Sequence, residues 1–409
     1  MMKCGLLGRR LGHSYSPQIH KTLGSYSYSL FEVEPEELEQ FLRSNDFQGL
    51  NVTIPYKKAV IPFLSELSPE AAKIGAVNTV VRRADGSLIG HNTDAFGFRS
   101  MAVRSGLNFS KKKVLVLGSG GASDTVFSVM EDLGAHPVRI SRSGPNHYGN
   151  LFLHADASAI VNATPVGMFP DTEKAPLTLE GFPALEGVLD VIYNPSRTQL
   201  LLEAERRGLV TENGLWMLVA QAKESAEWFT GKKIPDDKIG RIYRALRVQM
   251  ENIILVGMPG SGKTTVGKAL AAALHRQFLD ADTVLETSCR RTIPEIFQKD
   301  GESVFRSMET ETLAQLGKQS GLVLATGGGC VTRAENYPLL HSNGTIFWLN
   351  REIQKLPTDG RPLSQSGSLD RMYAVREPMY RAFADYAVDN NGSLQNTLEQ
   401  IMLHLEAEK

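Results

Sequence analysis

The segment 257–264 constrains the fold of this chain most strongly. It reads Gly-Met-Pro-Gly-Ser-Gly-Lys-Thr and matches the full pattern GxxxxGK[ST]. The apolar run 253–256 precedes it, and residues 266–274 with helical periodicity follow. In that strand–loop–helix context, backbone N–H groups and Lys263 hold nucleotide phosphates, and the Thr264 hydroxyl binds Mg²⁺. A nonfunctional glycine turn is the alternative, and the complete pattern weighs against it. The expected nucleotide contacts are Gly260, Ser261, Gly262, Lys263, Thr264 and Thr265.

A second glycine-rich loop begins at Gly118, directly after the apolar run 114–117. Its sequence, Gly-Ser-Gly-Gly-Ala-Ser, is GxGxxS at the start of a predicted helix, where a helix N-terminus can hold a dinucleotide pyrophosphate. The next predicted strand, 138–141, leads into Arg142, whereas NAD sites usually place a carboxylate there. A guanidinium suits a 2′-phosphate, so NADP is favoured over NAD. A tight turn in the core and a solvated surface arginine are the alternatives.

The order of the predicted elements indicates α/β architecture. Short β-branched runs alternate with amphipathic stretches over the 409 residues, a length that suggests two or three domains. Strands are predicted at 3–7, 28–33 and 47–54, with a helix after Pro35 and a hairpin turn at 85–86. The first folding body is expected to end near residues 249–250, with a short join to the next.

Composition excludes several classes of protein. Lys and Arg total 44 against 45 Asp and Glu, so neither a nucleic-acid surface nor an anionic membrane surface is expected. No apolar run approaches the ~20 residues that span a bilayer, and the start lacks the features of a signal peptide. The cysteines number 3 and are scattered. They fit a reducing cytoplasm better than a disulfide framework.

Polar residues follow several predicted strands in the first hundred residues. Ser14 and Ser16 lie at a predicted helix start, and Thr53 and Lys57 end the strand 47–54. Asp94 follows a later strand. Ser16 and Asp94 could instead be helix caps, and Lys57 could be a surface charge.

With correct spacing, these segments resemble the shikimate dehydrogenase family. The matching segments are HSYSP at 13–17, NVTIPYK at 51–57, AVNTV at 76–80 and NTDAFG at 92–97, and the resemblance extends over about residues 1–240. It implies reduction of 3-dehydroshikimate to shikimate by NADPH, with Lys57 and Asp94 as the catalytic pair. An ammonium group can protonate and stabilise the alkoxide that develops when a ketone accepts hydride. The implied substrate contacts are Ser14, Ser16, Thr53, Asn78, Tyr193 and Gln221. The implied cofactor contacts are Gly118, Ser119, Gly120, Gly121, Ala122, Ser141, Arg142, Asn162, Thr164 and Met168.

Residues 252–390 resemble shikimate kinase, which transfers the ATP γ-phosphate to the shikimate 3-hydroxyl. The match rests on the 257–264 loop, Phe-Leu-Asp-Ala-Asp at 278–282, Thr-Gly-Gly-Gly at 326–329, and the segments around Arg361 and Arg376. It implies Lys263 and Arg361 on phosphates, Asp280 with Thr264 near Mg²⁺, and Asp282 as the base that orients and deprotonates the hydroxyl. The implied shikimate contacts are Arg306, Arg376, Gly327, Gly328 and Gly329. The stretch between Leu349 and Arg361 is shorter than in the family, so the resemblance assigns no adenine contact.

Together the resemblances imply three domains. They are a substrate domain (1–100 with 214–249), a Rossmann-like NADP domain (101–213) and a P-loop kinase domain with a parallel sheet (251–409). The implied activity is bifunctional and cytoplasmic, and converts 3-dehydroshikimate to shikimate 3-phosphate with NADPH, ATP and Mg²⁺. Two alternatives stay open: an NAD-linked quinate/shikimate dehydrogenase fused to a small-molecule kinase, and a catalytically silent nucleotide-sensing regulator.

Overall fold

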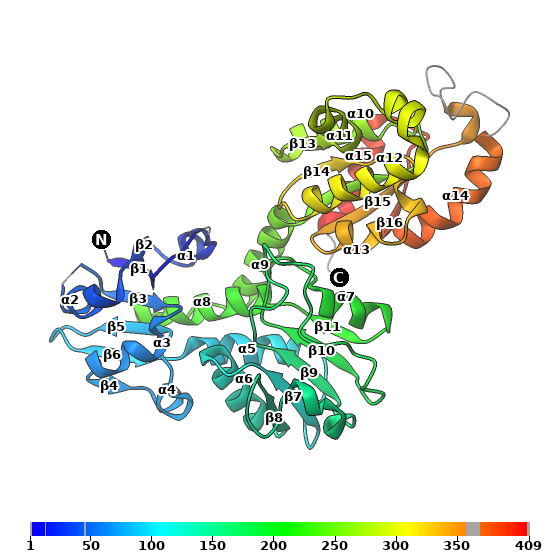
Figure 1. Cartoon of the computed structure of the whole chain (residues 1–409). Coiled ribbons are helices and arrows are strands. Elements are labelled where there is room, and N and C mark those ends of the chain that lie inside the picture. Colours follow the sequence, from blue (N-terminus) through cyan, green and yellow to red (C-terminus); the bar gives the residue numbers. More distant parts are fainter. Residues whose placement is uncertain (1, 13, 45, 357–368, 407–409) are drawn as a thin grey trace. The chain divides into compact units, whose positions relative to one another are not determined.

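The computed structural model describes residues 2–12, 14–44, 46–356 and 369–406. The chain divides into two compact units, Met1–Tyr193 with Thr198–Tyr243, and Asn194–Arg197 with Arg244–Lys409 (Figure 1). Both units contain sheets with parallel strands and intervening helices, as the sequence predicts. Within the described part of the chain, no helix combines the length and apolar character needed to cross a membrane.

The first sheet of the first unit is mixed, with the strand order β2-β1-β3-β5-β6-β4. β1 runs parallel to β2 and β3, whereas β5 is antiparallel to β3 and β6. The hairpin predicted at 85–86 joins β5 to β6, with Gly86 at a φ of +87°. The strands are β1 (Lys3–Gly8), β2 (Ser27–Glu32), β3 (Gly49–Val52), β4 (Glu66–Leu67), β5 (Thr79–Arg82) and β6 (Leu88–His91). The helices of this region are α1 (Ser16–Leu23), α2 (Leu38–Arg43), α3 (Tyr56–Ala59), α4 (Pro69–Ile74) and α5 (Thr93–Arg104).

Two predicted elements differ from the structure. The strand predicted at 47–54 is shorter, because the chain turns at Thr53, whose carbonyl accepts a hydrogen bond from Tyr56 N at 2.9 Å. That turn places Lys57 on α3 rather than at a strand end. The helix predicted after Pro35 begins as the 3₁₀ turn Pro35–Glu37 and becomes α-helical only at α2.

The second sheet of the first unit is parallel, with the order β11-β10-β9-β7-β8. The glycine-rich loop lies between β7 and α6, at the carboxyl edge of this sheet. Its elements are β7 (Lys113–Leu117), α6 (Gly121–Asp132), β8 (His136–Ile140), β9 (Ala159–Asn162), β10 (Gly187–Asp190), α7 (Gln199–Arg206) and β11 (Val210–Glu212). The long helix α8 (Leu215–Thr230) follows, and then α9 (Asp237–Met250).

The second unit is built on a parallel sheet of the order β13-β14-β12-β15-β16. Its strands are β12 (Asn252–Val256), β13 (Phe278–Asp280), β14 (Val323–Ala325), β15 (Gly344–Asn350) and β16 (Tyr386–Asp389). Its helices are α10 (Lys263–Leu274), α11 (Ala281–Cys289), α12 (Ile293–Gly317), α13 (Asn336–His341), α14 (Leu369–Phe383) and α15 (Leu394–Glu406). Because β12 is central, the loop that follows it reaches the middle of the carboxyl edge, where ligands of open α/β sheets bind.

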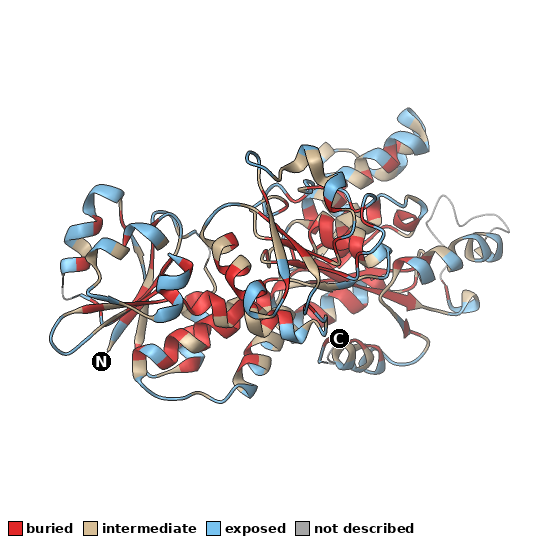
Figure 2. Cartoon of the chain, turned by 90° about the horizontal axis from the view of Figure 1, so that it is seen from below, coloured by how far each residue is buried: buried red, intermediate tan, exposed pale blue. Residues whose placement is uncertain are grey.

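Buried residues concentrate in the strands and on the helix faces that lie against them, while the outer helix faces are exposed (Figure 2). In β12, all positions are buried, as expected for a central strand covered by helices on both faces. These rigid cores hold the loops at the carboxyl edges in place.

Candidate active sites

Lys57 and Asp94 form a close ion pair in the first unit. Lys57 Nζ lies 2.5 Å from Asp94 Oδ2, and the two side chains are only 20% and 11% exposed. The structure contradicts the reading of Asp94 as a cap, because Asn92 caps α5 by accepting a hydrogen bond from Ala95 N at 3.2 Å. Lys57 is likewise not a solvated surface charge. The fold thus brings together an ammonium and a carboxylate that lie 37 residues apart.

A buried polar network adjoins Asp94. Asn78 Oδ1 accepts a hydrogen bond from Thr93 N at 2.6 Å, and Asn78 Nδ2 lies 3.4 Å from Gln221 Oε1. Ser225 Oγ, one helical turn beyond Gln221, donates to Gln221 O at 2.9 Å and lies 2.8 Å from Thr93 Oγ1. Asn78 Nδ2 also donates to Thr93 Oγ1 at 3.0 Å. Sequence reasoning missed Ser225, although a serine four residues after Gln221 in an apolar helix is a usable signal.

The predicted serines lie where α1 begins. Ser16 is the first residue of α1, but Tyr15 occupies the cap position, so the reading of Ser16 as an N-cap is wrong. Ser14 Oγ accepts a hydrogen bond from Ser16 N at 3.2 Å. The rings of Tyr15 and Tyr193 meet edge to face at 6.4 Å, which places Tyr193 beside the two serines.

Thr53 reaches the same edge of the first sheet. β1 and β3 are parallel neighbours, so the loops that follow them, with the serines on one and Thr53 and Lys57 on the other, leave the sheet at one edge. A Cβ on Gly8 would lie 2.8 Å from the Thr53 methyl group, so Thr53 packs closely against the end of β1.

The glycine loop of the first unit lies beside Lys57. Gly118 has a φ of +117°, and Gly120 is the N-cap of α6 without a side-chain hydrogen bond. A Cβ on Gly121 would lie 3.8 Å from Lys57 Cδ. A Cβ on Gly120 would meet nothing within 4 Å, so this glycine faces open space. The α6 N-terminus, with Ser119 before it and Ala122 in its first turn, is therefore exposed to a ligand next to the ion pair.

Other predicted dinucleotide contacts differ in their exposure. Arg142 is exposed and follows β8, which pairs with β7. Ser141 Oγ donates to Ser143 O, which tightens this turn. Met168 is 46% exposed.

Asn162 is buried, and its side chain is already engaged. It donates to Asp190 Oδ1 and Oδ2 at 3.1 Å and accepts from Thr164 N at 3.0 Å and Thr164 Oγ1 at 2.7 Å. Burial raises the pKa of Asp190 to about 7, against hydrogen bonds that lower it. Asn162 and Thr164 therefore shape the turn after β9. Sequence reasoning missed Asp190, which anchors that turn.

The phosphate loop of the second unit wraps around its own lysine. Gly257, Gly260 and Gly262 have φ values of +148°, +84° and +93°, which L side chains rarely adopt. Lys263 Nζ donates to Gly257 O at 2.8 Å and to Met258 O at 3.0 Å. Ser261 is fully buried, whereas Thr265 is exposed.

Oxygen ligands suited to a divalent cation lie beside this loop. Thr264 Oγ1 lies 2.9 Å from Asp280 Oδ2, and Asp280 also caps α11. The described residues hold no group of three or more metal-binding side chains of the His, Cys, Asp and Glu types. One hydroxyl and one carboxylate are nevertheless enough for Mg²⁺, which keeps several waters and binds substrate phosphates.

Asp282 lies in a crowded acidic environment. Burial, and then the carboxylates of Glu309 and Asp280, raise the pKa of Asp282 to about 6. A Cβ on Gly327 would lie 2.5 Å from Glu309 Oε1 and 2.9 Å from Asp282 Oδ1, so only glycine fits between them. Asp282 is thus a carboxylate of unusually high proton affinity.

Arg306 is held by Glu309 at 2.7 Å, and both are almost fully buried. A Cβ on Gly329 would collide with the Arg306 guanidinium. Arg376 Nη1 donates to Gly328 O at 3.2 Å, so both predicted arginines contact the 327–329 turn. Sequence reasoning did not assign Glu309 a role, although its i+3 spacing from Arg306 on a helix is a signal. The predicted phosphate contact Arg361 lies outside the described residues.

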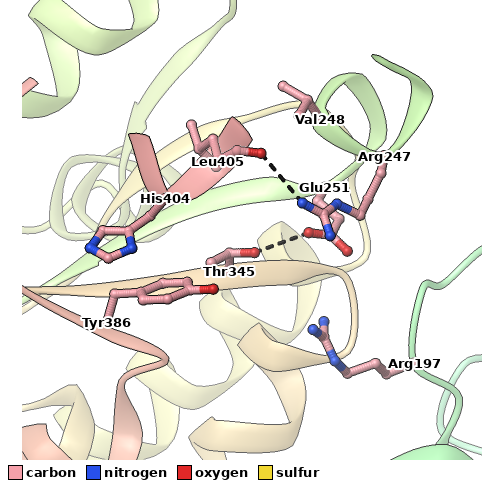
Figure 3. A pocket seen from close by; sticks show the side chains of 8 residues that line it. All are labelled: Arg197, Arg247, Val248, Glu251, Thr345, Tyr386, His404 and Leu405. Carbon is pink, nitrogen blue, oxygen red and sulfur yellow. Dashed lines mark hydrogen bonds between the residues drawn. The ribbon is translucent and has the colours of Figure 1, made fainter. Parts of the chain in front are cut away.

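One enclosed pocket of the second unit lies away from these groups. Arg197, Arg247, Glu251, Tyr386 and His404 are among its lining residues (Figure 3). It holds about 30 Å³ of solvent-sized space. That is room for one or two waters rather than a substrate. Its residue Thr345 lies at the start of β15, whereas the phosphate loop follows the end of β12.

Comparisons with known proteins match both halves of the chain to known families. A family model described as shikimate dehydrogenase substrate binding domain matches residues 6–80, and one described as shikimate kinase matches residues 259–406. Shikimate dehydrogenase (NADP(+)) of Symbiobacterium thermophilum is 37% identical over 266 residues, which cover 57% of this chain and 90% of that protein. Shikimate dehydrogenase 1 from Peptoclostridium difficile superposes with a TM-score of 0.56 at 36% identity, covering 61% of this chain and 98% of that one. Shikimate 5-dehydrogenase from Thermus thermophilus, in complex with NADP(H) and shikimate, gives a TM-score of 0.55 at 32% identity and covers 60% and 99%.

Proposed function

The chain belongs to the shikimate dehydrogenase family and carries a shikimate kinase domain, and we propose how its residues divide the work of this bifunctional shikimate-pathway enzyme. The first unit reduces 3-dehydroshikimate to shikimate with NADPH. The second unit transfers the γ-phosphoryl group of ATP to the 3-hydroxyl of shikimate. The contact of Lys57 with Asp94 at 2.5 Å, beside a bare dinucleotide loop, carries this proposal.

In the reduction, Lys57 is the proton donor. When bound, NADPH supplies hydride to the ketone carbon, and the ketone oxygen becomes an alkoxide. Lys57 stabilises this charge and transfers a proton to it. Asp94 holds the ammonium group in place and hydrogen-bonds the reacting hydroxyl. Partial burial strengthens these interactions because the local dielectric is lower than that of water.

The other polar residues of the first unit bind the substrate. Asn78 and Gln221 present amide groups to its hydroxyls, while Ser14 and Ser16 contact its carboxylate. Thr53 and Tyr193 complete the set. The buried hydroxyl of Ser225 keeps Asn78 and Gln221 oriented.

For the cofactor, we propose NADP rather than NAD. The α6 N-terminus takes the pyrophosphate, and exposed Arg142 pairs with the 2′-phosphate. The NAD-linked alternative predicts equal or better kcat/KM with NADH than with NADPH, so comparing the two cofactors on one preparation separates the two.

In the phosphorylation, the residues of the second unit mainly position the two substrates and neutralise the phosphate charge. Lys263 and the loop amides hold the ATP phosphates, and Thr264 and Asp280 hold Mg²⁺, which offsets the phosphate charge. Asp282 accepts the proton of the 3-hydroxyl. The hydroxyl oxygen forms a bond to the γ-phosphorus, and the bond between that phosphorus and the leaving ADP breaks. Arg306 and Arg376 bind the shikimate carboxylate, and the 327–329 turn keeps them in place.

The test supplies 3-dehydroshikimate, NADPH and Mg·ATP to the full chain and follows NADPH loss and ADP formation separately. Both signals are expected, with ADP formation requiring either NADPH or added shikimate. A chain that binds both nucleotides but turns over neither is the silent regulator of the alternative hypothesis. NADPH loss without ADP formation overturns the kinase half alone.

A further inference from the structure

Arg351 lies at the carboxyl edge of the second sheet, although no sequence motif marks it. It directly follows β15, which pairs with β12, the strand that leads into the phosphate loop. A Cβ on Gly262, the glycine before Lys263, would lie 3.6 Å from Arg351 Nη1. The guanidinium therefore lies next to the start of α10, where the loop amides are directed at phosphates.

One donor of this guanidinium group, Nε, is buried and lacks a hydrogen-bond partner among the residues that the structure describes. The neighbouring carboxylate of Glu352 pairs with Lys355 instead, at 3.1 Å. Withdrawing a charged donor from water without a partner is costly, and an anionic ligand removes that cost.

The backbone around Arg351 is held to the phosphate loop. Asn390 N donates to Asn350 O at 2.9 Å, and the N–H that follows Arg351 donates to Asn391 Oδ1 at 2.8 Å. The Asn390 side chain donates to Ser261 O at 2.5 Å. Both neighbours of Arg351 are thus fixed to the turn after β16, and that turn is fixed to the phosphate loop. A side chain positioned in this way loses little entropy on binding.

We propose that Arg351 binds the α- and β-phosphates of the nucleotide in the kinase site. The inference rests on the proposed kinase function and adds a phosphate contact that the sequence did not indicate. A guanidinium suits this role because its planar donors can contact two phosphate oxygens at once.

The test compares the wild-type chain with Arg351→Gln, Arg351→Lys and Lys355→Gln, all at full length. Binding of ADP, AMP and adenosine is measured by calorimetry without Mg²⁺, so that phosphate contacts are not masked by the metal. Lys355→Gln is the matched control, since it removes an exposed cation of the same segment that already has a carboxylate partner. A thermal melt of each variant, compared with that of the wild type, checks that the second unit, which contains Arg351, is folded.

Arg351→Gln is expected to weaken ADP binding by about ten- to a hundredfold, to weaken AMP binding less, and to leave adenosine binding unchanged. Arg351→Lys should recover part of the loss, and Lys355→Gln should bind like the wild type. An equal loss for all three ligands would mean that Arg351 contacts the adenine ring and would overturn the proposal, as would unchanged ADP binding. A wild-type chain that binds no ADP would instead refute the kinase function on which the proposal rests.

Discussion

The two glycine loops that we propose as phosphate sites differ in backbone conformation and in charge. The loop of the first unit has one glycine at positive φ, Gly118, and leaves the N-terminus of α6 without a side-chain cap. The loop of the second unit has several glycines at positive φ and curls around Lys263. The first loop therefore depends on cations from neighbouring strands and loops, whereas the second carries its own. A dinucleotide has to lie across the sheet edge, while a triphosphate has to be enclosed.

The two carboxylates proposed to act in catalysis, Asp94 and Asp282, also differ in their surroundings. Asp94 forms an ion pair with the ammonium group of Lys57. Asp282 faces the carboxylates of Glu309 and Asp280, and its pKa is raised to about 6. These surroundings suit the roles proposed above, in which Asp94 positions a proton donor and Asp282 accepts a proton. The environment of each group, rather than its residue type, sets its role.

The largest expected effect comes from breaking the ion pair. Lys57→Ala should lower kcat/KM for 3-dehydroshikimate reduction by about 10⁴-fold, since both the proton donor and the charge that stabilises the alkoxide are lost. Shikimate phosphorylation by the same variant should be unchanged. Lys58→Ala, which removes an exposed lysine paired with Asp124, is the control. Reduction that survives Lys57→Ala would refute the assignment of Lys57.

Asp282→Asn tests the other carboxylate. Phosphorylation should fall by about 10²–10³-fold while reduction continues, because an amide cannot accept the proton of the 3-hydroxyl. In the wild-type chain, phosphorylation should decline as the pH falls through about 6, since Asp282 becomes protonated there. A rate that stays level down to pH 5 would show that Asp282 is not the base.

The same substitution should affect stability with a definite sign. A carboxyl group whose folded-state pKa is raised disfavours folding at pH values where it is ionised, and this cost disappears as the pH falls below the unfolded value. Asp282→Asn should therefore raise the free energy of unfolding of the second unit at pH 8 by about 1–3 kcal/mol. The gain should vanish near pH 4. Thermal melts of the wild-type chain and of Asp282→Asn between pH 4 and pH 8 measure this gain in stability. An equal gain at all pH values would indicate a packing effect instead.

Gly120→Ala tests whether the first loop binds by bare backbone. A Cβ there meets no protein atom within 4 Å, so the fold should tolerate it. It should still obstruct the pyrophosphate and raise the KM for NADPH about ten- to a hundredfold with little change in the KM for 3-dehydroshikimate. Gly181→Ala controls for a general effect of losing a glycine, because a Cβ there also meets nothing within 4 Å. If Gly120→Ala leaves the KM for NADPH unchanged, the pyrophosphate lies elsewhere.

Arg142→Gln should have the smallest effect. The ratio of kcat/KM with NADPH to that with NADH should fall about tenfold, because one exposed ion pair to the 2′-phosphate is lost. NADH kinetics should be unchanged. If the two cofactors lose activity equally, Arg142 acts on the fold of its turn and not on the 2′-phosphate.

Several site features could be predicted from the residues because local patterns encode them. The phosphate loop of the second unit, for example, is one continuous segment. Its glycines stand at positions where the backbone has a positive φ. Ser16 and Asp94 show what single residues in the sequence could not decide. As single residues they were compatible with caps, and only the positions of Tyr15 and Asn92 excluded that reading. Ser225 and Glu309 offered only a local spacing signal, and Arg351 offered none, because its place beside Gly262 depends on the pairing of separate strands.

Features encoded by continuous stretches of sequence could thus be recognised from the order of the residues alone. They are the two nucleotide loops, the two family patterns and the alternation of strands and helices. Tertiary packing alone decided the pairing of Lys57 with Asp94, the raised pKa of Asp282, and the position of Arg351 beside the phosphate loop. The reason is physical. Backbone conformation depends on near neighbours, whereas charge, desolvation and hydrogen-bond geometry depend on groups that come together only when separate strands and helices pack.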